Sequence, residues 1–296
     1  MSGATAVGAP APGDAGAQPE LRPIEVEDIS VRFGAVRALA DVSFSVAPGT
    51  IHAVIGPNGA GKSTMFNVLS GIYKASSGQV RYGDAMLTSM EPHRIANLGI
   101  ARAFQNIALS GTQTVTENLL LGRHHLTKAG FLSSGLRLPR ATREARRHTE
   151  RVREIATFLD LGDKLDTPVG VLSYGDQKRV EVARALCIEP QVLLLDEPVA
   201  GMNADETQRM AEIVLEIRDA LGITIVLVEH DMGMVMGIAD RVTVLDFGRR
   251  IADGTPVEVQ ADPEVIRAYL GAGDDSGDDA AADSEPPFPS DEERTS

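Results

Sequence analysis

A glycine-rich stretch, residues 56–64, constrains this chain more than any other feature. It fits the pattern G-x-x-x-x-G-K-[ST], with the fixed positions at Gly56, Gly61, Lys62 and Ser63. Residues 51–55 before it predict a buried strand, and residues 64–71 after it predict a helix. Glycines allow a tight turn that aims backbone N–H groups at a phosphate, and a helix N-terminus adds partial positive charge. The stretch therefore predicts a phosphate-binding P-loop; the alternative is a glycine-rich turn without a ligand.

Within such a loop the side chains have separate tasks. Lys62 is expected to reach the β- and γ-phosphates of a nucleotide, and Ser63 is expected to hold Mg²⁺. The remaining positions offer backbone N–H groups. The residues predicted to surround the phosphates are Gly56, Pro57, Asn58, Gly59, Ala60, Gly61, Lys62, Ser63 and Thr64.

Composition bounds the class of protein. With 296 residues and 43% hydrophobic content, the chain is long enough for one large globular domain or two smaller ones. Its apolar runs fall short of the roughly 20 residues that cross a bilayer, and its start lacks the pattern of a secretory signal. The single cysteine, Cys187, lies in an apolar-periodic stretch and is predicted to be a buried structural thiol, not a nucleophile. These features favour a reducing cytoplasm.

The net charge of −14 is unevenly distributed. Residues 274–296 hold nine acidic side chains against one arginine, a net charge of −8, which leaves −6 for the remainder. Residues 1–23, rich in Ala, Gly and Pro, and residues 272–296 are both expected to be disordered tails around one domain at 24–271. Arginines on a helix predicted at 141–161 could form a docking surface, but glutamates lie among them. We predict a solvated helix face and no nucleic acid.

The order of elements indicates an α/β fold. Alternating residues at 24–33 and 42–46 predict antiparallel strands before the P-loop, and residues 91–172 have helical spacing. The last third alternates helices with buried strands, as a parallel sheet requires. The helices are predicted at 174–188, 204–221 and 263–270, and the strands at 192–195, 223–228 and 241–247.

Two of these strands end in polar side chains. Asp196 and Glu197 follow the apolar strand 192–195; Asp196 is expected to coordinate Mg²⁺ through water, and Glu197 to polarise the attacking water. An acidic pair at a strand end is also common on plain surfaces, so the P-loop is what favours catalysis. His230 follows the strand at 223–228, at the sheet edge where ligands bind, and could reach the γ-phosphate or serve only as a cap.

A second possible phosphate site begins the helix at 174–188. Ser173 is predicted to be its N-cap, followed by Gly175, although a capped helix explains both without a ligand. The succession of P-loop, Gln105, Leu-Ser-x-Gly-x-Gln, acidic pair and His230 resembles ATP-binding cassette (ABC) proteins from about residue 24 to 271. The resemblance implies a mixed sheet core, an antiparallel β subdomain and a helical signature subdomain at about 106–190.

The same resemblance implies roles for residues that no local pattern assigns. Phe33 would stack on the adenine of ATP, where core packing is the alternative, and Gln105 would link Mg²⁺ to a transmembrane partner. Two cassettes would close head to tail, so that Ser173 and Gly175 touch the ATP held by the other P-loop. ATP and Mg²⁺ are the cofactors implied.

Finer motifs resemble the LivG-type ATP-binding subunits of branched-chain amino acid importers. They lie at 101–106, 114–120, 172–175, 200–203 and 265–271. Tyr174 and Asn203 depart from the general cassette pattern but occur in this type. The resemblance implies an ATPase at the cytoplasmic face of the membrane, bound to a second, paralogous cassette and two transmembrane permease subunits, and served indirectly by a solute-binding protein. The alternatives are cassettes of urea, amide or lipid transporters, and mechanical ABC ATPases, whose long coiled coils are absent here.

Overall fold

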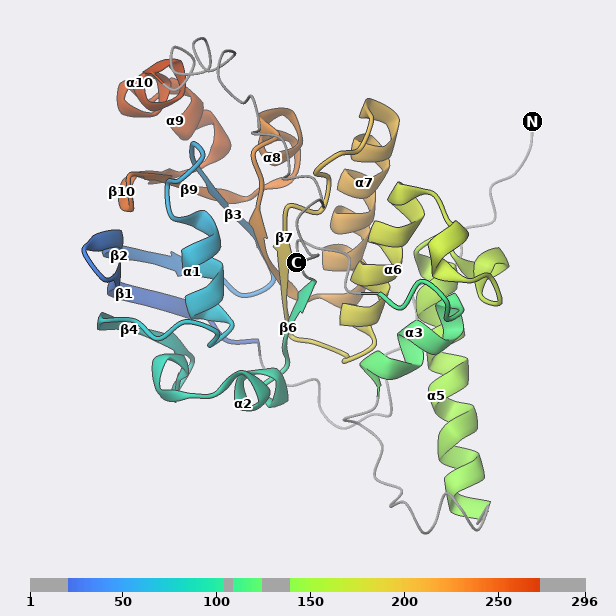
Figure 1. Ribbon diagram of the computed structural model, residues 1–296. Coiled ribbons are helices and arrows are strands. Elements are labelled where there is room, and N and C mark those ends of the chain that lie inside the picture. Colours follow the sequence, from blue (N-terminus) through green and yellow to red (C-terminus); the bar gives the residue numbers. More distant parts are fainter. Residues whose placement is uncertain (1–20, 104–108, 124–138, 272–296) are drawn as a thin grey trace, which may run out of the picture.

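The computed structural model describes residues 21–103, 109–123 and 139–271, which form two β-sheets and the helices around them (Figure 1). Gln105 and nearly all of both predicted tails lie outside these residues. The first sheet is antiparallel, with the order β2 (Val36–Val46), β1 (Ile24–Phe33), β4 (Ser77–Tyr82) and β5 (Ala85–Met86). It is the predicted antiparallel unit, with a second strand that starts six residues earlier than expected.

The second sheet has six strands and carries the P-loop. Its order is β10 (Arg249–Gly254), β9 (Arg241–Asp246), β3 (Ile51–Ile55), β8 (Thr224–Val228), β7 (Val192–Asp196) and β6 (Ile100–Ala103). Only β10 runs antiparallel to its neighbour. The carboxyl ends of the five parallel strands therefore meet at one edge, where polar residues that follow different strands come together.

This six-stranded sheet separates two hydrophobic cores. In β8, Ile225 and Leu227 face one core, whereas Val226 and Val228 face the other. The first core takes in α3 (Val115–Gly122), α5 (Pro139–Phe158) and α6 (Tyr174–Leu186), and the second takes in α1 (Lys62–Leu69) and the antiparallel sheet. Period-two alternation places successive side chains of each strand in opposite layers, as expected of strands buried on both faces.

The remaining helices complete the two layers. They are α2 (Pro92–Asn97), α7 (Ala204–Leu221), α8 (Met232–Ile238), α9 (Pro256–Ala261) and α10 (Pro263–Gly271), with short 3₁₀ turns at Leu87–Ser89, Gly162–Lys164 and Val169–Val171. Figure 1 shows α3, α5 and α6 on the opposite side of the molecule from the antiparallel sheet. Within the described residues, no helix combines the length and apolarity that a membrane crossing needs.

The α/β fold class is confirmed, with some corrections. The stretch 91–172 was expected to be helical, but Ile100–Ala103 pairs with β7 as a parallel strand. Neither β10 nor α8 and α9 was predicted. Cys187 is buried, and burial raises the pKa of its thiol to about 12, as expected of a structural thiol.

Candidate functional site

The P-loop joins β3 to α1 at the carboxyl edge of the central sheet, as predicted. Gly56 has φ 151°, and a Cβ there would lie 2.0 Å from the carbonyl oxygen of Leu245. Gly61 has φ 100°, and a Cβ there would lie 2.7 Å from the carbonyl oxygen of Ala38. Both positions therefore require glycine, because a side chain would collide with backbone of neighbouring segments in a conformation that is already strained.

Lys62 is buried and turns back over the loop. Its Nζ donates to the carbonyl oxygens of Gly56 at 2.7 Å and of Pro57 at 2.9 Å. Burial lowers the pKa of Lys62, and the nearby carboxylates of Glu197, Asp196 and Glu229 oppose this shift. The ammonium group thus lies at the loop, among acidic side chains that follow β7 and β8.

Asp196, at the end of β7, is held by one oxygen only. Its Oδ2 lies 2.6 Å from Nη2 of Arg102, whereas its buried Oδ1 has no hydrogen-bond partner among the described residues. Burial raises the pKa of Asp196, and the guanidinium of Arg102 opposes that shift. Arg102 donates also to Asn67 Oδ1 and to Ser70 Oγ near the end of α1. The chemistry of Oδ1, an oxygen acceptor still to be satisfied, fits a hard cation or a water bound to one.

Glu197 adopts a conformation that is uncommon outside glycine. Its φ is 49°, and its N–H donates to the carbonyl oxygen of Val228 at 2.9 Å. A non-glycine residue in the left-handed region costs on the order of 1 kcal/mol or more, and such outliers are concentrated at functional sites. Five other non-glycine residues of the described chain also have positive φ, so what ties Glu197 to the site is its bond to Val228, which holds it at the carboxyl edge of the sheet.

His230 lies at the same sheet edge, after β8. Its side chain is 59% exposed. A cavity of about 880 Å³ is lined by His230 and by Gly56, Pro57, Asn58 and Ala60 of the P-loop, together with residues of the β9–β10 hairpin and of α10. The structure thus brings His230 and the P-loop together, while Ser63 is exposed at the start of α1. A phosphate chain bound to the P-loop would therefore lie near the imidazole of His230.

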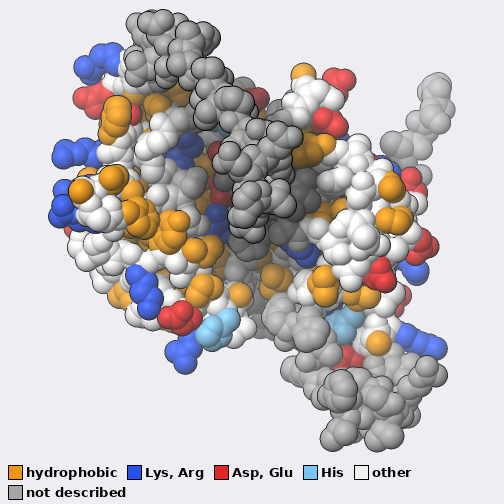
Figure 2. Space-filling model, in the orientation of Figure 1, with side chains coloured by type: hydrophobic (Ala, Val, Ile, Leu, Met, Phe, Trp, Pro, Cys, Tyr) orange, Lys and Arg blue, Asp and Glu red, His pale blue; other side chains and the backbone are white. Residues whose placement is uncertain are grey.

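Phe33 is at the end of β1 and is 47% exposed. Its ring meets that of Tyr73 edge to face, with the centroids 5.1 Å apart. Figure 2 shows hydrophobic side chains gathered over α1 and the antiparallel sheet, and the exposed large side chains there include Phe33, Val36, Ile72 and Tyr73. Phe33 is therefore available to a flat ligand and is not buried in a core.

Ser173 and Gly175 begin α6, as the capping pattern predicts. Ser173 Oγ accepts a hydrogen bond of 3.1 Å from the N–H of Asp176. A Cβ at Gly175 would lie 2.9 Å from Glu206 Oε1, the end of a flexible side chain at the start of α7. Since α6 packs in one core and α1 in the other, the two helix starts lie on opposite faces of the sheet.

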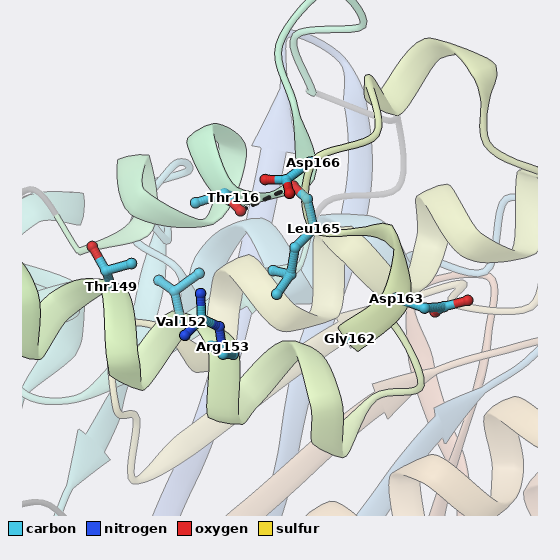
Figure 3. Close-up of a pocket in the computed structure, with 8 residues that line it drawn as sticks. All are labelled: Thr116, Thr149, Val152, Arg153, Gly162, Asp163, Leu165 and Asp166. Atoms are coloured by element: carbon cyan, nitrogen blue, oxygen red, sulfur yellow. Dashed lines mark hydrogen bonds between the residues drawn. The ribbon is translucent and has the colours of Figure 1, made fainter.

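A smaller cavity, of about 330 Å³, lies between α3 and α5 (Figure 3). Beside it the hydroxyl of Thr116 donates to the carbonyl oxygen of Leu165 at 2.9 Å. Its lining, in the described chain, includes none of the residues predicted for the nucleotide site. Along α5, Arg143, Arg146, Arg147 and Arg153 are exposed, as expected of a solvated face.

Two charged residues at the site, the partly buried Arg102 and the buried Glu229, were missed by sequence reasoning. Arg102 bonds Asp196 across 94 residues of chain, and Glu229 bonds Val199 across 30. Both lie beside predicted positions, Arg102 before Gln105 and Glu229 before His230. The available signal was a charged residue within a short apolar run, for Arg102, or directly after one, for Glu229, but the partner could not be read from spacing.

Comparison with known proteins identifies the family. The model for the ABC transporter family matches residues 39–200, and a model described as branched-chain amino acid ATP-binding cassette transporter matches residues 249–275. The chain is 40% identical to the high-affinity branched-chain amino acid transport ATP-binding protein LivG of Escherichia coli K12 over 251 residues, 84% of this chain and 97% of LivG. It is 38% identical to BraF of Pseudomonas aeruginosa, which has the same description, over 84% of this chain and 98% of BraF.

A solved structure agrees with this assignment. The crystal structure of an ATP-binding cassette of an ABC transporter in its ADP conformation superposes with a TM-score of 0.74 and 34% identity, covering 85% of this chain and 100% of that one. The fold, the P-loop with its acidic partners and the sequence similarity across nearly the whole described chain agree. The chain is a nucleotide-binding ATPase of the ABC transporter family.

Proposed function

We propose that this protein is the ATP-hydrolysing subunit of an importer for branched-chain or related amino acids. One observation carries the proposal: Lys62, Asp196 and Glu197 meet at one sheet edge, in a chain 40% identical to LivG. The solute does not enter the cassette, so the choice of branched-chain amino acids, over urea, amides or lipids, rests on similarity to LivG and BraF.

ATP would place its phosphates on the N–H groups of the P-loop, with Lys62 at the β- and γ-phosphates. Phe33, which is half exposed, would stack on the adenine. Ser63, Asp196 through its unsatisfied Oδ1, and Gln105 would hold Mg²⁺, which when bound neutralises phosphate charge. Gln105 lies outside the described residues, and its role here rests on the resemblance alone.

Hydrolysis would depend on the two residues that follow β7 and β8. Glu197 would accept the proton of the attacking water, and His230 would contact the γ-phosphate. Both lie beyond strand ends fixed in the sheet, Glu197 through its bond to Val228. Attachment to buried strands keeps such side chains in place during the reaction.

A second cassette, expected to be a paralogue, would complete the site. Ser173 and Gly175 begin α6, which packs in the core opposite to that of α1, and this placement supports a phosphate contact across a head-to-tail pair. Two transmembrane permease subunits would hold the pair at the cytoplasmic face of the membrane, and a solute-binding protein would deliver the amino acid to them. Nucleic acid has no part in this proposal.

The test is solute-stimulated ATPase activity of the assembled transporter. We expect leucine, isoleucine or valine, presented by the binding protein, to raise the rate, and Lys62→Ala to lower it by at least about 100-fold, because the charge on the β- and γ-phosphates is lost. Lys74→Ala is the matched control, since Lys74 is exposed and, among the described residues, pairs with Glu91 alone. Near-normal turnover of Lys62→Ala would defeat the proposal, and stimulation by urea or a lipid alone would correct the solute.

A further inference from the structure

Glu229 is a buried carboxylate between two loops of the site. It directly follows β8, and its side chain has no exposed surface. Its Oε1 accepts a hydrogen bond of 2.9 Å from the N–H of Val199, two residues after Glu197. Its Oε2 accepts from the N–H of His230 at 3.0 Å and, more weakly, of Asp231 at 3.4 Å. One side chain thus joins the loop after β7 to the loop after β8.

We propose that Glu229 is a positioning residue, which holds Glu197 and His230 in a fixed arrangement by binding the backbone of both their loops. The inference rests on the proposed ATPase function and adds to it a residue that need not touch the nucleotide. Glu229 is linked to Glu197 through the N–H of Val199, two residues further along the chain, and it is linked to His230 through the N–H of His230 itself. Small displacements of catalytic groups lower rates strongly, by up to about 100-fold for 1 Å.

The chemistry explains why a carboxylate occupies this position. N–H groups approach from both sides, and an ionised carboxylate is the side-chain group with two acceptor oxygens and no donor. The charge is unfavourable here, because burial raises the pKa of Glu229, although the N–H groups of Val199, His230 and Asp231 oppose that shift. A negative charge beside a triphosphate site also repels the ligand. A neutral group would avoid both the burial of a charge and the repulsion of the ligand. The advantage of the carboxylate is that its two oxygens can bind the backbone of both loops.

Glu229→Gln separates positioning from simple structural support. The amide keeps the shape but has one acceptor oxygen, and its NH₂ group must face an N–H of one loop. That oxygen should stay with His230 and Asp231, which leaves the N–H of Val199 without its acceptor. We expect kcat to fall by about 10- to 100-fold. Affinity for MgATP should stay the same or rise, because a negative charge near the phosphates is removed.

Asp240→Asn is the matched control. Asp240 Oδ2 likewise accepts a backbone hydrogen bond, of 2.8 Å from the N–H of Ile51, but at the other end of β3 from the P-loop. This carboxylate-to-amide change should alter stability without changing kcat. Glu229→Asp is the second variant, in case the amide prevents folding: it keeps the charge, but its side chain is too short to bind both loops, so kcat should again fall while the affinity is kept.

The experiment measures kcat and KM of the assembled transporter, MgATP affinity of the full chain by titration with a fluorescent ATP analogue, and melting temperature. The positioning role of Glu229 is supported if Glu229→Gln lowers kcat without lowering the affinity for MgATP and Asp240→Asn leaves kcat unchanged. Normal kcat in a folded Glu229 variant overturns it, as does a parallel loss of kcat, affinity and stability. Lys62→Ala in the same assay distinguishes the two proposals. If Lys62→Ala stays active, the proposed ATPase function fails. If Lys62→Ala is inactive but the Glu229 variants stay active, only the positioning role of Glu229 fails.

Discussion

His52, near the start of β3, has no exposed surface, and its ring stacks on Phe44 of the antiparallel sheet. Its Nε2 lies 2.9 Å from Thr243 Oγ1 on β9. Burial lowers the pKa of His52 from 6.5 to about 4. At the scale of single residues, the packing that joins two sheets thus suppresses a charge that water would allow near pH 5.

This suppressed charge predicts acid sensitivity. Between pH 6.5 and about 4 the unfolded chain binds a proton at His52 that the folded chain does not, so the free energy of unfolding falls as pH falls. The expected slope from this residue is up to about 1.4 kcal/mol per pH unit. Urea titrations from pH 4.5 to 7.5 on wild type and His52→Gln measure the difference. The exposed His93→Gln is the control, and equal slopes in all three proteins would contradict the assignment.

Among the elements, α7 has a reciprocal cap at its start. Asn203 Oδ1 accepts from the N–H of Glu206 at 3.0 Å, and Glu206 Oε2 accepts from the N–H of Asn203 at 3.1 Å. Asn203→Ala removes the first acceptor and should lower the free energy of unfolding by about 1 kcal/mol. Asn203→Asp keeps an oxygen there and should cost far less. Chemical denaturation of the three proteins checks this, and indistinguishable Ala and Asp variants would show that the cap contributes nothing.

How far the sequence predicts the fold depends on the element. Long periodic segments such as α7 were predicted with correct bounds, because their signal is local. The four-residue strand β6 was not, since its pairing with β7 bridges about ninety residues and Arg102 interrupts its apolar run. The seven-residue α8 contains two glycines, which weaken any helical pattern. The site divides in the same way: motif residues were predicted, whereas Arg102 and Glu229 depend on distant partners.

For the whole molecule, the opposite placement of α1 and α6 leads to an assembly prediction. Glu197→Gln should bind ATP without hydrolysing it, because the amide cannot accept the proton, and so accumulate the closed pair with the partner cassette. Light scattering after gel filtration with ATP and Mg²⁺ measures the mass. The double variant with Lys62→Ala should stay unpaired, since nucleotide binding is weakened. A Glu197→Gln protein that never pairs would mean that Ser173 and Gly175 do not complete a neighbour's site.

The position of one sheet between two cores also determines where the chain can accept an inserted residue. The pairing of Asp196 with Val228 belongs to the same ladder that sends alternate side chains of β7 and β8 into opposite cores. Inserting a single residue in either strand would exchange the two sets of side chains and shift the following loop by about 3.3 Å. An insertion within β7 or β8 would therefore disturb both cores, whereas an insertion after the strand ends lengthens only the loops.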